Sequence, residues 1–389
     1  MSEREFDIIV YGASGFTGRL VAEYMQAQYG RSVNWAMAGR SEEKLAQVRD
    51  EMGVDAATPL VTGNADSADE MAAMAARTKV MITTVGPYQL YGAALVAACA
   101  AAGTDYVDLS GEPGWMHGVI DAHDATAKAS GARIVHSCGF DSIPFDLGVY
   151  YLQMAAQEKF GEPCQQVRTR VRAMNGEFSG GTAASMGATM AAVAKNPELL
   201  NVLVNPFSLA NGFQGPEQPA DNAIYEDEAS GQWVAPFIMA PINTKNVHRS
   251  NALLGHAYGE DFIYDEMMLA GAGAEGKAMA EFVASVNPLA GDDVPQPGEG
   301  PSKESREAGN YDVWFIGTTK SGQRLEAAAG GDMDPGYGST SKMLAESAMC
   351  LLTECDGLAG GVYTPAPAMG EKLIKRLCDN AGLYFRMEG

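Results

Sequence analysis

The sequence has no pattern of cysteines or histidines that would form a disulfide framework or hold a metal ion. Its 389 residues include six scattered cysteines without a C-x-x-C pair, and five histidines without an H-E-x-x-H motif. Isolated cysteines of this kind are typical of free thiols in a reducing compartment. We therefore expect no bound metal, and we interpret the histidines as structural.

Basic residues are scarce relative to acidic ones. The chain has 27 Lys and Arg against 49 Asp and Glu, a formal net charge of −22. Because phosphate groups are neutralised by basic side chains, this balance argues against nucleic acid and anionic membranes as partners. No apolar run approaches the roughly 20 residues of a membrane helix, and the polar, acidic N-terminus has no signal-peptide pattern. We expect a cytoplasmic protein without a transmembrane segment.

Two common catalytic motifs are also missing. The sequence contains no G-x-S-x-G nucleophile elbow, and no tyrosine is followed four residues later by the lysine of the short-chain dehydrogenase pair. The composition, with 46% hydrophobic and 20% charged residues, is that of a globular protein with a large core. A chain of this length predicts two domains.

The strongest positive signal lies in the first eighteen residues. Residues 5–11 predict a short apolar strand, which runs through the turn GASGFTG into an amphipathic helix. In a dinucleotide-binding unit the first glycine permits the tight turn, the second admits the pyrophosphate, and the third allows close helix packing. The helix start, with free N–H groups, then receives the anion. The candidate cofactor contacts of this turn are Gly12, Ser14, Gly15, Phe16, Thr17 and Gly18.

The end of the second predicted strand indicates which dinucleotide is bound. An NAD site would place an acidic residue there to accept from the ribose 2′-hydroxyl, whereas this sequence has Arg40 followed by Ser41. An arginine and a hydroxyl suit a 2′-phosphate. The alternative is that Arg40 is only a solvated residue at a strand end. Placed after the glycine turn, the pair favours NADP.

Three further turns follow predicted strands and should lie on one rim. Val85–Tyr88 follows the fourth strand, Ser110–Glu112 the fifth and Gly139–Ser142 the sixth. In a doubly wound sheet the ligand lies beyond the carboxyl ends of the strands. We therefore expect the nicotinamide half of the cofactor there, and a packed tyrosine in a proline turn is an equally good interpretation of Tyr88. The candidate contacts are Val85, Gly86, Pro87, Gly111 and Gly139.

Six strands alternating with helices predict an α/β fold with an N-terminal Rossmann domain over residues 1–150. The pattern then changes. Residues 167–173 alternate apolar positions with three arginines, which predicts a half-buried strand whose arginines form a solvated face or bind an acidic substrate. The glycine-rich junction 176–182 is either an anion site or a plain turn. We expect residues 151–334 to form a second α/β domain with a mixed sheet.

Several segments together resemble the saccharopine dehydrogenase-like family, specifically its trans-acting enoyl reductase branch. The segments are GASGFTG at 12–18, AGRS at 38–41, VGPY at 85–88, DLSGE at 108–112, GFDSIPFDLG at 139–148, FSGGTAASM at 178–186, DPGYGSTSKM at 334–343 and GGVYTPA at 360–366. The resemblance implies a bound NADP, a substrate-binding second domain that would also carry any homodimer contact, and a C-terminal segment 335–389 that returns to the first domain. It also implies reduction of an enoyl thioester of a lipid or polyketide intermediate, the acyl group being free or carrier-bound.

Such a reaction needs a hydride for the β-carbon, hydrogen-bond donors for the enolate oxygen and an acid for the α-carbon. Asp141 or Ser142 should cap the helix that begins there, and the N–H groups around Ser142 are candidate donors. The candidate catalytic residues are Tyr88, Ser142 and Tyr337. Two alternatives stay open: an imine- or amino-acid-forming dehydrogenase like saccharopine dehydrogenase, and a non-catalytic NADPH-binding protein.

Overall fold

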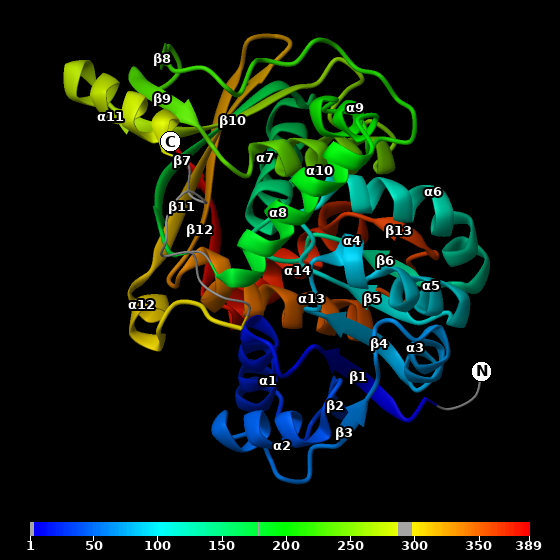
Figure 1. Ribbon diagram of the computed structural model, residues 1–389. Helices are drawn as coiled ribbons and strands as arrows, with labels where there is room; N and C mark the ends of the chain where they lie inside the picture. The colour runs from blue at the N-terminus through cyan, green and yellow to red at the C-terminus, as the bar shows by residue number, and fades with distance from the viewer. Residues whose placement is uncertain (1–3, 178, 287–297) are drawn as a thin grey trace.

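The computed structural model describes residues 4–177, 179–286 and 298–389 and contains two seven-stranded sheets (Figure 1). The first sheet is parallel, and its strands are nearly all apolar because helices cover both faces. Its strand order is β13 (Gly361–Tyr363), β6 (Arg133–Val135), β5 (Asp105–Val107), β4 (Thr78–Thr83), β1 (Phe6–Tyr11), β2 (Trp35–Gly39) and β3 (Leu60–Thr62). The order reverses between β1 and β4, which makes this the switch point of a Rossmann fold.

The helices that follow these strands pack on opposite faces of the first sheet. One face carries α1 (Phe16–Gln28), α2 (Glu42–Glu51) and α13 (Thr340–Glu354). The other face carries α3 (Ala68–Ala75), α5 (Ala93–Ala102) and α6 (Pro113–Ser130), with the short α4 (Tyr88–Tyr91) before α5. The side chains of Ser41 and Ser67 cap α2 and α3 by accepting from the third backbone N–H beyond them, as their sequence positions indicate.

The second sheet is mixed: β7 and β10 run parallel, and all other neighbouring pairs are antiparallel. Its strand order is β14 (Leu383–Glu388), β12 (Arg324–Gly331), β11 (Asn310–Thr319), β7 (Cys164–Asn175), β10 (Ile263–Gly271), β9 (Gln232–Pro236) and β8 (Tyr225–Asp227). The remaining helices of the described chain are α7 (Ile143–Phe160), α8 (Gly180–Lys195), α9 (Leu199–Val204), α10 (Ala240–Leu253), α11 (Gly273–Ser285), α12 (Lys303–Ala308), the π-helical turn η1 (Pro335–Ser339) and α14 (Pro365–Asn380). The expected α/β class with a mixed second sheet is confirmed.

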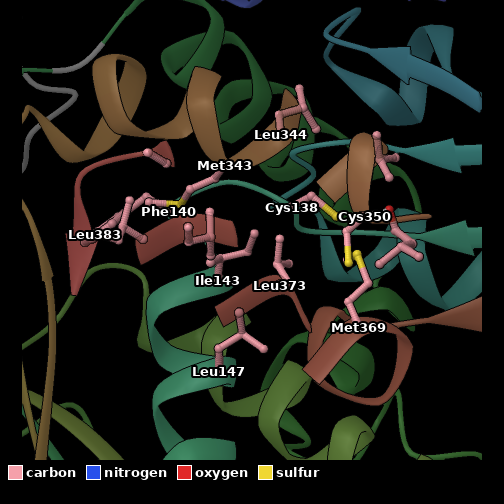
Figure 2. Packing of buried hydrophobic residues seen from close by; sticks show 14 of the residues in the cluster. Cys138, Phe140, Ile143, Leu147, Met343, Leu344, Cys350, Met369, Leu373 and Leu383 are labelled. Atoms are coloured by element: carbon pink, nitrogen blue, oxygen red, sulfur yellow. Dashed lines mark hydrogen bonds between the residues drawn. The ribbon is translucent and has the colours of Figure 1, made fainter. Parts of the chain in front are cut away.

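A single apolar core joins the two sheets. Figure 2 shows Cys138 and Phe140 from the end of β6, Ile143 and Leu147 from α7, Met343 and Leu344 from α13, and Leu373 from α14 within one cluster. α7 also packs against β11 and β12 of the second sheet, and α14 packs against β14. Phe315 of β11 fills the space that a Cβ on Gly148 of α7 would need. The two sheets are therefore packed through shared helices rather than linked by a free hinge.

The C-terminal segment divides between the two sheets. α13 packs against α1, β4 and β5, and β13 adds the seventh strand to the first sheet. The last strand, β14, instead pairs antiparallel with β12 at the edge of the second sheet. The expected return of residues 335–389 to the first domain therefore needs correction for 383–388. The domain boundaries at 150 and 334 stay a prediction.

Two of the three arginines on β7 match neither interpretation of the alternating pattern. Arg170 is completely buried, and its guanidinium pairs with Asp227 at 2.9 Å and with Asp265 at 2.6 Å. Arg172 pairs with Asp312 and Glu388 at 2.8 Å each. Because paired carboxylates already neutralise these two side chains, they form neither a solvated face nor an open anion site. They tie β7 to its neighbours and to β14.

Candidate functional site

The glycine turn after β1 leaves room for a pyrophosphate. Gly12 has φ +90°, and a Cβ on it would lie 2.6 Å from Thr84 Oγ1. A Cβ on Gly18 would lie 2.1 Å from the Gly12 carbonyl oxygen, so α1 could not approach the turn with any other residue there. Gly15 is exposed, and the nearest atom to its Cβ position is the Gly12 carbonyl oxygen at 3.3 Å. No side chain caps α1 at Gly15, and its first turn contains no acidic residue.

This geometry fits a dinucleotide phosphate in the way the three glycines predict. The first and third glycines are fixed by protein packing, whereas the second faces solvent at the positive end of a helix. Of the other predicted contacts in the turn, Ser14 lies near β2, with its Oγ 3.5 Å from the Cβ position of Gly39. The ring of Phe16, at the start of α1, packs edge-on against Tyr337 with 5.2 Å between centroids.

Arg40 and Ser41 lie at the end of β2, beside this turn. Arg40 is exposed, and its guanidinium forms no hydrogen bond or ion pair with a residue in the described ranges 4–177, 179–286 and 298–389. The Ser41 hydroxyl oxygen accepts from the Lys44 N–H at 3.3 Å, which leaves its proton available to a ligand. The pair thus presents a cation and a donor, as expected for a 2′-phosphate site.

A network of hydrogen bonds holds the three turns at the carboxyl ends of β4, β5 and β6 together. The Glu112 carboxylate accepts from the N–H groups of Tyr88 and Gln89, both at 2.9 Å. Asp108 accepts from the Ser110 and Ser137 N–H groups, and its second oxygen lies 2.7 Å from His136 Nδ1. Burial raises the pKa of Glu112 above its usual range. The predicted rim therefore exists and is rigidly connected.

The remaining predicted cofactor contacts lie on this rim. Val85 Cγ2 lies 2.8 Å from the Cβ position of Gly12, so the end of β4 touches the glycine turn directly. Gly86, before Pro87, faces α8, with Ser185 Oγ 3.8 Å from its Cβ position. Gly111 borders open space, whereas Gly139 is packed against Thr340 of α13.

Tyr88 is a packed residue in this structure. Its hydroxyl donates to the Thr83 carbonyl at 3.1 Å and accepts from the Leu109 N–H at 3.3 Å, and only 4% of its surface is exposed. Burial and the nearby Asp108 carboxylate raise its pKa well above the usual range. This geometry favours the packed-tyrosine interpretation, since the hydroxyl bonds β4 to the turn after β5.

Ser142 is also buried, and it stands at the N-cap position of α7. Its hydroxyl accepts from Asn246 Nδ2 of α10 at 2.7 Å, and it makes no side-chain cap on α7. The N–H groups of Ser142 and Ile143 donate to the carbonyls of Ser137 and Gly139. Ser142 therefore stands at the N-cap position of α7, one of the two positions expected, but its hydroxyl forms no capping hydrogen bond. Because the N–H groups of Ser142 and Ile143 are satisfied within the turn, they do not form an open oxyanion site.

Asp141, whose side chain was considered from the sequence only as a cap, has an unpaired carboxyl oxygen on this rim, as His136 has an unpaired Nε2, within the described ranges. The Asp141 Oδ1 is buried and has no hydrogen-bond partner among the described residues. Burial raises the pKa of Asp141 from 3.8 to about 7, so the carboxyl group carries a proton at slightly acid pH. The sequence signal was its position after a strand in GFDSIP; the burial that shifts its pKa comes from the second domain and is not visible in the local sequence.

Tyr337 connects the two domains over the cofactor turn. Asp334 fixes the η1 turn by accepting from the N–H groups of Tyr337 and Gly338. The Tyr337 hydroxyl accepts from the Ser179 N–H at 2.5 Å and lies 2.9 Å from Thr182 Oγ1. Residues 179–182 of the glycine-rich junction therefore lie at the rim; Phe178 of this segment is outside the described residues.

A cavity of about 430 Å³ opens beside the rim, between α4 to α6 and the α8–α9 pair. Glu112, the last residue of the second rim turn, and Gln89, the residue after the first, line it. Over residues 4–177, 179–286 and 298–389, no group of His, Cys, Asp and Glu side chains is arranged to hold a metal ion. No helix in those same ranges is both long and apolar enough to cross a membrane.

A parallel sheet with a glycine turn at its switch point, joined to a mixed sheet, defines a Rossmann-type protein with an NADP-binding first domain. Residues 8–135 match the saccharopine dehydrogenase NADP binding domain. The chain belongs to the saccharopine dehydrogenase-like family, in the branch of the trans-acting enoyl reductases.

Curated relatives match almost the whole chain. A Mycobacterium tuberculosis relative, whose name proposes trans-acting enoyl reductase activity, is 43% identical over 401 residues, covering 96% of each chain. The trans-acting enoyl reductase of Mycobacterium leprae is 38% identical over 403 residues, again covering 96% of each. Among solved structures, saccharopine dehydrogenase (L-Glu forming) from Saccharomyces cerevisiae superposes with a TM-score of 0.57 at 10% identity, over 99% of this chain and 100% of that one. This last likeness shows the fold alone.

Proposed function

We propose that this protein reduces the carbon–carbon double bond of an enoyl thioester with NADPH. The observation that carries the proposal is the match along 96% of the chain to relatives named trans-acting enoyl reductase, together with a glycine turn whose geometry suits a dinucleotide. The acyl group would be part of a lipid or polyketide intermediate.

The cofactor, when bound, supplies the hydride for the β-carbon of the substrate. In this proposal the N-terminus of α1 holds the pyrophosphate at Gly15, and Arg40 and Ser41 hold the 2′-phosphate. The turns at 85–87 and 111, with Gly139, support the nicotinamide half. Asp141 is the acid that protonates the α-carbon, since its carboxyl proton has no partner within the described residues.

The three tyrosine and serine candidates take different roles. Tyr337 closes over the substrate and joins α8 to the cofactor helix, because its hydroxyl contacts Ser179 and its ring contacts Phe16. Tyr88 and Ser142 are positioning residues, since each hydroxyl is already hydrogen-bonded inside the protein. Their assignment as proton donors stays a prediction that this geometry disfavours.

The test is reduction of an enoyl, keto and imine panel with deuterium-labelled NADPH. Enoyl reduction predicts loss of NADPH together with a saturated thioester that carries one deuterium at the β-carbon, measured by mass spectrometry. Turnover only with a keto acid and an amine would instead support the imine-forming alternative. Tight NADPH binding with no turnover across the panel would support the non-catalytic alternative.

A further inference from the structure

We propose that the cavity between α4 to α6 and the α8–α9 pair receives the apolar acyl chain of the substrate, a site that rests on the proposed function. Its volume of about 430 Å³ lies within the range of small-molecule sites. The walls are formed by three pairs of side chains from three helices: Trp115 and Val119 of α6, Ala192 and Val193 of α8, and Leu199 and Leu203 of α9.

The polar lining of this cavity is gathered beside the cofactor rim. Gln89 Nε2 donates to Thr189 Oγ1 at 3.0 Å, and the Gln89 N–H donates to the Glu112 carboxylate at 2.9 Å. Gln89, Glu112 and Thr189 therefore lie together, beside the two rim turns that we expect to support the nicotinamide. A thioester head would lie at this polar side while the chain extends into the apolar part.

The cavity extends along α6. His123, two turns beyond Trp115 on the same helix, also lines it. Eight residues of α-helix rise about 12 Å, so the cavity borders α6 over about that length. In this proposal the hydrocarbon chain of the substrate follows the cavity along α6.

Local packing keeps the walls in place. The Trp115 ring lies against the backbone at Gly92, where a Cβ would stand 2.7 Å from it. On the opposite wall, Lys245 of α10 donates to the Leu203 carbonyl at 2.7 Å and thereby holds the end of α9. Trp115 Nε1 is buried without a partner among the described residues, so this lining residue keeps an unused hydrogen-bond donor.

The surface around this cavity is unusually apolar. Within the described ranges, five of the nine large exposed hydrophobic side chains lie on the cavity-forming helices α4, α8 and α9: Leu90, Tyr91, Met190, Leu200 and Val204. α8 contacts both α4 and α9 in the fold (Figure 1). Because isolated exposed apolar residues are normal but clustered ones mark binding surfaces, the cluster supports an apolar ligand that enters here.

Filling the cavity tests the assignment. Ala192→Phe would place a ring among the lining residues, whereas Ala191→Phe adds the same ring at the neighbouring exposed position of α8. Each methylene kept from an apolar site weakens binding roughly fourfold, so displacing about three methylenes predicts a roughly fiftyfold loss. We expect kcat/KM for dodecenoyl-coenzyme A to fall by that factor in Ala192→Phe while crotonyl-coenzyme A changes less than about twofold. Ala191→Phe should match the parent with both substrates.

Calorimetry with dodecanoyl-coenzyme A separates this proposal from the proposed reaction, since it requires no turnover. Binding by the parent and by Ala191→Phe, with roughly fiftyfold weaker binding by Ala192→Phe, supports the cavity even if no enoyl substrate is reduced. Enoyl reduction with the same chain-length profile in parent and Ala192→Phe would overturn the cavity and leave the reaction standing. Absence of dodecanoyl-coenzyme A binding to the parent would also overturn the cavity.

Discussion

The raised pKa of Asp141 leads to a prediction about both the stability of the protein and its rate of reduction. Burial raises its pKa from 3.8 to about 7, so the folded protein binds this proton more tightly than the unfolded chain does. Such a group favours the folded state fully below about pH 4, and that contribution is lost as the pH rises through the interval from about 4 to 7. Replacing Asp141 with Asn removes the titration while it keeps the size of the side chain.

The magnitude follows from the size of the shift. One pKa unit corresponds to about 1.4 kcal/mol. The shift from 3.8 to about 7 therefore sets an upper bound of ~4 kcal/mol on the pH-dependent part of the unfolding free energy. Because Asp141 retains some exposure to solvent, we expect about half of that. The unfolding free energy of Asp141→Asn minus that of the parent should therefore be ~2 kcal/mol higher at pH 8 than at pH 4, as measured by urea denaturation at both values.

The catalytic part of the same prediction uses the pH–rate profile. As a general acid, Asp141 should give a kcat/KM that falls above about pH 7, and Asp141→Asn should lower the rate about 10²–10⁴-fold and lose that limb. Asp146 provides the control: burial also raises its pKa to about 7, but its carboxylate accepts from the Ala366 N–H inside the core. Asp146→Asn should alter stability and leave the limb in place. Equal stability effects of Asp141→Asn at both pH values, or an unchanged limb, would refute the reasoning.

Three further predictions concern the cofactor turn and its cover. Arg40→Ala should weaken NADPH binding roughly ten- to a hundredfold, the value of a charge-assisted contact, and barely alter NADH binding by calorimetry; equal losses would remove Arg40 from the 2′-phosphate. Gly15→Val should abolish binding of both cofactors with an unchanged circular dichroism spectrum, because its side chain would occupy the pyrophosphate position; normal affinity would show that the phosphate lies elsewhere. Tyr337→Phe should raise KM several-fold with little change in kcat, since it releases Ser179 and Thr182; a hundredfold fall in kcat at constant KM would identify Tyr337 as the acid instead.

The Rossmann domain could be read from the sequence because its signals are local. The strand, glycine turn and helix start at residues 5–18 form one continuous pattern. The side chains of Ser41 and Ser67 cap their helices by accepting from backbone N–H groups only three residues further on. The three rim turns could be located because each directly follows a short apolar strand pattern.

The roles of individual polar side chains could not be read in the same way, because they depend on distant partners. Ser142 is taken up by Asn246, more than a hundred residues away, and Arg170 by Asp227 and Asp265. The placement of β14 depends on its pairing with β12, since its own sequence of alternating residues fits the edge of either sheet. Local patterns fix secondary structure, whereas long-range contacts fix burial and hence pKa.

The interleaved C-terminal segment constrains the order in which this chain can fold during synthesis. α13 covers the face of the first sheet beside α1, and β14 closes an edge of the second. α13 is translated after six of the seven strands of the first sheet, and β14 after all other strands of the second, so a nascent chain that ends before residue 340 would leave an apolar surface uncovered. Neither sheet can reach its native packing until those residues leave the ribosome. We therefore expect both sheets to reach their native packing only after α13 and β14 have been synthesised.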